Sequence, residues 1–151
     1  MRGVVVGALS LAGLALGWNS TTGAQTISNP EAVRACVCQQ QSLATLLDDV
    51  HTRQQSYDNG QKELASLNSA LEAQRTKMDI YNDADVQAYK KLLQRRDDAA
   101  AVFTGETTQS YNAAIARYNE AMGGYNGNCG GKSFDPDVYA KVQAALSCPK
   151  P

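Results

Sequence analysis

The sequence predicts an all-α protein: a long, coiled-coil-like antiparallel hairpin of two helices, followed by a short C-terminal helix and stapled by disulfides. Three observations lead to this fold class. One stripe of side chains recurs every seven residues from Cys36 to Met78, and a matching stripe runs from Val86 to Tyr125. The third observation is four cysteines in a chain of 151 residues that opens with an export-type leader. Heptad stripes indicate packed helices, and paired cysteines indicate disulfides.

The first 24 residues read as a signal peptide. Arg2 precedes an apolar run from Val4 to Leu16, and Thr22-Gly23-Ala24 then places small residues at the positions required for cleavage after Ala24. Cleavage after Gly17 is the second choice. The run is shorter than the ~20 residues that span a bilayer, so a membrane anchor is less favoured. We therefore expect an exported protein, periplasmic or extracellular, with no stable membrane insertion after cleavage.

The first helix is expected over residues 30–80. Asn29 can cap it, and Pro30 occupies the first helical position, where proline is tolerated. The expected seam then repeats seven times at intervals of seven: Cys36, Leu43, Val50, Tyr57, Leu64, Leu71 and Met78. Such a repeat predicts one long helix with a coiled-coil seam.

The second helix is expected over residues 83–125, with Asn82 or Asp83 as its cap. A short turn near residue 82 makes the two helices antiparallel neighbours, so facing residues have numbers that add to about 164. This register places Leu43 by Ala121, Val50 by Ala114 and Leu64 by Ala100, among other pairs. Most of these pairs match a large side chain with a small one, which favours close packing.

The spacing of the second stripe changes between Phe103 and Tyr111, at the level of Gly60 and Gly105. We interpret this stutter as a weak point where the hairpin bends or its supercoil unwinds. In a continuous hairpin, alanine at either glycine should stabilise the fold. The alternative is a compact four-helix bundle in which both helices break at the glycines, and there alanine should destabilise.

A short third helix is expected over residues 136–147. Asp135-Pro136-Asp137 supplies the cap and first turn, and Val138, Val142, Ala145 and Leu146 form an apolar stripe. A helix this short is not stable alone, so we expect it to dock on the open end of the hairpin.

The four cysteines predict two disulfides. A Cys36–Cys38 bond is disfavoured because residues two apart on a helix point in roughly opposite directions. The hairpin register places Cys36 beside Cys129, so we expect Cys36–Cys129 across the hairpin base and Cys38–Cys148 to pin the tail. The swapped pairing is the main competitor.

The alternative use of the Cys36-Val37-Cys38 pair is metal or thiol chemistry, because thiolates bind soft metals. His51, the only histidine, lies about four helical turns from the pair. No second Cys-x-Cys and no Cys-x-x-Cys accompanies it. We therefore favour structural disulfides and expect no metal or other cofactor.

Charge and motif content argue against two large classes of function. With 14 basic and 15 acidic residues, the net charge of −1 lacks the basic excess of nucleic-acid-binding proteins. Histidine-dependent catalysis would have to use His51, which has no nucleophile elbow or oxyanion loop near it in the sequence. We expect a protein that is not an enzyme and does not bind nucleic acid.

A Tyr-Asn pair recurs every seven residues, at Tyr111, Tyr118 and Tyr125. The simpler interpretation is that the tyrosine rings pack at the edge of the heptad seam with their hydroxyl groups in solvent. The alternative is that they form an aromatic strip to which a partner docks. With Leu46, these tyrosines could pair a second hairpin into a four-helix bundle.

From these observations we expect an exported, non-enzymatic structural or protein-interaction module that acts as a spacer, adaptor, chaperone-like clamp or inhibitor. Its partner would be another exported protein or a second copy of itself. The alternative from a different class is a periplasmic metal- or thiol-handling protein that uses Cys36 and Cys38.

Overall fold

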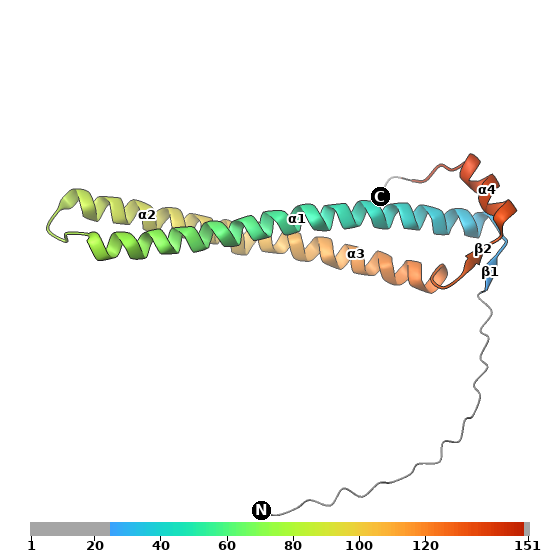
Figure 1. Cartoon of the computed structure of the whole chain (residues 1–151), viewed down its shortest axis with the longest axis horizontal. Helices are drawn as coiled ribbons and strands as arrows, with labels where there is room; N and C mark the ends of the chain where they lie inside the picture. The colour runs from blue at the N-terminus through green and yellow to red at the C-terminus, as the bar shows by residue number, and fades with distance from the viewer. Residues whose placement is uncertain (1–24, 150–151) are drawn as a thin grey trace, which may run out of the picture.

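The protein is a long two-helix rod with a small unit folded onto one end (Figure 1). The structure, a computed structural model, describes residues 25–149, so the expected signal peptide at residues 1–24 lies outside the described residues. The elements are β1 (Thr26–Ile27), α1 (Pro30–Lys77), α2 (Asp83–Val102), η1 (Phe103–Thr107), α3 (Thr108–Asn128), β2 (Ser133–Phe134) and α4 (Pro136–Ala144). The predicted fold class is confirmed.

Helix α1 is one uninterrupted helix of 48 residues, about 70 Å long at 1.5 Å per residue. The Asn29 side chain caps it by accepting hydrogen bonds from the backbone N–H groups of Glu31 (2.9 Å) and Ala32 (3.0 Å). The helix ends at Lys77, three residues before the predicted end, because Met78 adopts an extended conformation. Since α1 passes straight through Gly60, the compact four-helix bundle is excluded.

The predicted second helix is two α-helices joined by a π-helical turn. Asn82 caps α2 by accepting from the N–H of Ala84 at 3.0 Å. Five residues, Phe103–Thr107, then form the π-helix η1, and α3 continues to Asn128, three residues beyond the predicted end. The π-helix falls where the stripe changes its spacing, so the predicted weak point is a local change of helix type and not a break.

Contacts along the rod show that α1 runs antiparallel to the helical segment formed by α2, η1 and α3. Cys36 meets Cys129 near the open end, Asp49 meets Arg117 further along, and Tyr57 meets Phe103 near the middle. Residue numbers therefore rise along α1 as they fall along the facing helices. The numbers of facing residues add to about 164, as predicted.

The open end of the hairpin holds the most compact core. Val33 and Val37 of α1 pack with Val142 of α4, and Ile27, Phe134, Val138 and Leu146 lie around them. Strands β1 and β2 pair in parallel beside this cluster, a two-residue ladder that the sequence analysis did not predict. Helix α4 ends at Ala144 and not at residue 147, so Cys148 lies in the tail that follows it.

The rest of the rod has a thin core. Between Leu43 and Leu67 no residue of α1 is buried, and Ala114 is the one buried residue of α3. A two-layer hairpin leaves the outer faces of both helices in solvent, so links between the helices matter for its stability. Within residues 25–149, no helix is long and apolar enough to cross a membrane.

Candidate functional site

Two disulfides fix the open end of the rod. Cys36 of α1 is bonded to Cys129 at the end of α3, and Cys38 is bonded to Cys148 in the tail after α4. The Cα–Cα distances are 5.7 and 5.3 Å, as expected for disulfides. This is the predicted pairing and not the swapped one. Cys36 and Cys129 are each 3% exposed, so the first bond forms part of the core.

The two disulfides argue against the alternative function, metal binding or thiol chemistry at Cys36 and Cys38. All four cysteines are bonded, so the Cys36-Val37-Cys38 pair offers no thiolate to a metal or to a redox partner. His51 is exposed and makes no side-chain hydrogen bond within the described residues. Two disulfides are typical of a protein that matures in an oxidising, exported compartment.

An aromatic cluster occupies the middle of the rod, at η1. The Phe103 ring lies 4.9 Å from the Tyr57 ring between centroids, and Tyr111 lies 5.3 Å from Tyr57 on the other side. The α1 backbone at Gly60 adjoins the Phe103 ring. Tyr57 thus contacts two aromatic side chains from the opposite side of the hairpin, Phe103 at the start of the π-helical turn and Tyr111 after it.

Two threonine hydroxyls donate to backbone carbonyls in and beside the π-helical turn. Thr108 donates from Oγ1 to the Phe103 carbonyl at 2.7 Å, and Thr104 donates to the Ala100 carbonyl at 2.8 Å. The Phe103 carbonyl also accepts from the backbone N–H of Thr108, so the Thr108 hydroxyl adds a second hydrogen bond at this carbonyl. π-Helical bulges are frequent at functional sites.

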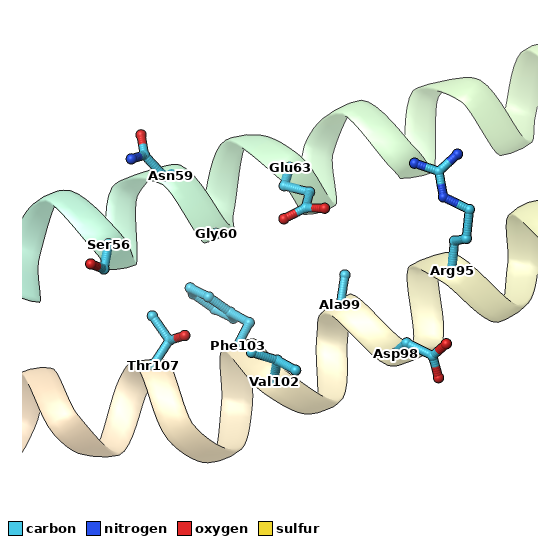
Figure 2. Close-up of a pocket in the computed structure, with 10 residues that line it drawn as sticks. All are labelled: Ser56, Asn59, Gly60, Glu63, Arg95, Asp98, Ala99, Val102, Phe103 and Thr107. Carbon is cyan, nitrogen blue, oxygen red and sulfur yellow. The ribbon is translucent and has the colours of Figure 1, made fainter.

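An open groove of about 460 Å³ runs beside η1, between α1 and α2 (Figure 2). Phe103, Ala99 and Gly60 contribute its apolar part, and the α1 wall carries Glu63. Figure 2 shows Arg95 reaching toward α1 and Glu63 turned into the space between the helices. Neither side chain forms an ion pair within residues 25–149.

One ion-pair network links the helices between the groove and the disulfides. Asp49 accepts from Arg53 on its own helix at 3.1 Å and from Arg117 on α3 at 2.9 Å. The hydrogen bond from Arg53, and then the one from Arg117, lower the pKa of the Asp49 carboxyl below its ordinary value. The sequence analysis did not single out this pair, although the hairpin register places Asp49 within one turn of Arg117.

The three candidate tyrosines lie along the hairpin seam. Tyr111, Tyr118 and Tyr125 are each half-buried on α3, and the Tyr111 ring packs at a tilt against the Tyr57 ring within the chain. This position agrees with packing at the heptad edge. Their role as a partner surface stays a prediction.

The turn that joins α1 and α2 presents the most exposed large apolar side chains among the described residues. Ile80 is 66% exposed and Tyr81 is 91% exposed. The sequence analysis did not identify them, because it placed residue 80 inside the first helix. The signal available in the sequence was an apolar pair beside Asn82-Asp83, where turns usually carry small or polar residues.

Comparison with known proteins adds no relative: no family model, no curated protein and no solved structure matches this chain. The function must therefore be inferred from the geometry of the rod, its disulfides and its surfaces.

Proposed function

We propose that this protein is an exported, non-enzymatic interaction module, a disulfide-stapled helical spacer that presents its surface to another exported protein. The observation that carries the proposal is the architecture of the rod. A 48-residue helix packs along a single antiparallel partner, and most of both helices stays at the surface. A rod of this shape can contact a partner protein along its length. It can also hold two partners, one bound at each end, at a fixed distance from each other.

The staples support this role. The bond between Cys36 and Cys129 closes the open end, and the turn after Lys77 closes the other, so the two helices are joined at both ends of the rod. A surface that is ordered before binding loses less conformational entropy on association. A stapled hairpin is thus suited to act as a spacer, an adaptor or an inhibitor.

Export is part of the proposal. The leader at residues 1–24 has the composition of a signal peptide, and both disulfides require an oxidising compartment. The periplasm and the cell exterior both meet this requirement. No specific observation favours the metal- or thiol-handling alternative, because both sulfurs of the Cys-Val-Cys pair are bonded.

Photo-crosslinking along the rod tests the proposal. A photoreactive amino acid is placed in turn at Gln54, Gln87 and Gln109, three exposed positions on α1, α2 and α3. Irradiation in the native exported fraction should give a discrete crosslinked protein from at least one position. The same photoreactive protein with both disulfides reduced before irradiation serves as the control, and it should lose the product.

The proposal fails if no position on the folded rod, the turn after Lys77 included, gives a crosslinked protein. It also fails if a broad substrate screen shows turnover that depends on particular side chains of this chain.

A further inference from the structure

The tip of the hairpin, residues 79–82, carries two exposed apolar side chains that do not pack in the core of the rod. Ile80 and Tyr81 are adjacent, and most of each side chain is in solvent. The other exposed large apolar residues, Leu47, Val102 and Tyr139, are each less exposed and lie apart from one another in the sequence. Single exposed apolar residues are ordinary on a protein surface, but an adjacent pair at the apex of a rod is a concentrated apolar feature.

The local structure of the turn does not use these two side chains. The Asp79 carboxylate accepts from the N–H of Tyr81 at 2.9 Å, and the Asp85 carboxylate accepts from the N–H of Asp79 at 3.1 Å. The N–H of Asn82 donates to the Asp79 carbonyl at 3.0 Å. Carboxylate and backbone hydrogen bonds therefore hold the turn in place. The side chains of Ile80 and Tyr81 take no part in these bonds and are exposed to solvent.

Charge restricts what the tip can contact. The segment from Lys77 to Asp85 carries three carboxylates, at residues 79, 83 and 85, against the single cation of Lys77. The negative end of the α1 dipole and the positive end of the α2 dipole meet at this tip and offset each other, so the side-chain charges set its sign. The tip is acidic. Like charge opposes both a second copy of the same tip and an anionic membrane surface.

We propose that Ile80 and Tyr81 insert into an apolar pocket with a cationic rim on another exported protein, with Asp83 facing that rim. This inference rests on the proposed function and names the contact surface. Tyrosine is enriched among residues that dominate binding energy, and a complementary charge at the rim steers association. Asp83 is exposed and makes no side-chain hydrogen bond or ion pair within the described residues, so its carboxylate is available to a partner.

The first experiment places the photoreactive amino acid at Tyr81 and compares it with Gln87, an exposed position on α2 just beyond the turn, and with Gln54 in the middle of α1. The expected result is a crosslinked protein from position 81 and not from position 54. Mass spectrometry then identifies the crosslinked residues of the partner, which should be apolar with lysine or arginine around them.

The second experiment measures binding of the purified partner. Ile80→Ser and Tyr81→Ser should each weaken affinity about tenfold or more, because each removes part of the inserted group. Asp83→Asn should weaken affinity less and should reduce its dependence on salt. Gln87→Ser is the matched control and should change nothing. Because both apolar side chains are exposed, thermal melting of the variants should match that of the unaltered protein.

The outcomes separate the two proposals. Crosslinks from Gln54, Gln87 or Gln109 without any from position 81 would overturn the tip proposal and leave the interaction module standing. No crosslink from any position would overturn both. A crosslink from position 81 to lipid, or to a second copy of this chain, would overturn the assignment to a protein pocket.

Discussion

The ring of Phe103 lies against Gly60 so closely that a β-carbon at position 60 would come within 2.7 Å of Cδ2 and 3.3 Å of Cε2. Gly60 does not have the positive φ that only glycine adopts readily. It is required by the approach of a neighbouring ring, in the middle of an ordinary helix. The packing of Phe103 therefore argues against the expectation that alanine at this position stabilises a continuous hairpin.

Gly60→Ala and Gly105→Ala should change stability in opposite directions. Gly60→Ala should lower the free energy of unfolding by about 1–3 kcal/mol, because the Tyr57 ring beside Phe103 hinders the ring from moving away. Gly105 has no atom within 4 Å of its missing β-carbon, so Gly105→Ala should raise stability by about 0.4–1 kcal/mol. Denaturant unfolding measures both values.

The double variant Gly60→Ala with Phe103→Leu provides the control. Leucine is smaller than the ring, so in this background the alanine should cost less than it does alone. A stabilising Gly60→Ala variant would contradict the close packing of the two residues.

Periodicity in the sequence was sufficient to predict the hairpin and both disulfides. The seven-residue repeat fixes which face of α1 meets its partner, and a short turn fixes the register, so Cys36 must lie near Cys129. Cys38 points away from that seam, which favoured its bond to Cys148 in the tail over the swapped pairing. These are consequences of helix geometry, which varies little between proteins.

The sequence predicted less about details that depend on single contacts. The stutter marked the level of η1 but not its helix type, because a change of spacing does not give the backbone hydrogen-bond pattern of the turn. The exposure of Ile80 and Tyr81 depends on where α1 ends, and helix ends are poorly determined by periodicity. The groove beside η1 depends on where the Arg95 and Glu63 side chains point, which no spacing rule gives.

The disulfide between Cys36 and Cys129 should dominate the stability of the hairpin. It closes a loop with a sequence separation of 93, so replacing both cysteines by alanine should cost about 2–5 kcal/mol. Replacing Cys38 and Cys148 should lower the main helical melting temperature less, because that bond holds the tail and leaves the hairpin closed. Circular dichroism melts compare the two variants.

A thiol titration of the unaltered protein without reductant controls this comparison, and it should detect no free thiol. Two or more free thiols would contradict the bonding pattern and would restore the metal-binding alternative.

The hydroxyl group of Thr108 should stabilise the π-helical turn. Its hydrogen bond to the Phe103 carbonyl is 2.7 Å long and half-buried, so Thr108→Val should lower the free energy of unfolding by about 0.5–1.5 kcal/mol. Thr45 is the matched control: its hydroxyl donates to the Gln41 carbonyl at 3.3 Å on the exposed surface of α1. Thr45→Val should be close to neutral. Equal costs at the two positions would show that the π-helical turn does not depend on this hydroxyl.

The ion pairs of Asp49 should give the hairpin a specific response to acid. The two arginines lower the pKa of the Asp49 carboxyl in the folded protein, so the carboxylate stabilises the fold above its unfolded pKa of about 3.9. This contribution is lost as the pH falls through the lower, folded pKa. Asp49→Asn should therefore be less stable than the unaltered protein at pH 7, and the difference should disappear in strong acid. The effect should be small and should weaken with salt, because both arginine partners are largely exposed. Asp48→Asn, at the neighbouring exposed carboxylate, is the control and should show no such dependence. Denaturant unfolding at a series of pH values tests the prediction, and a difference for Asp49→Asn that persisted at low pH would show that its cost comes from packing and not from charge.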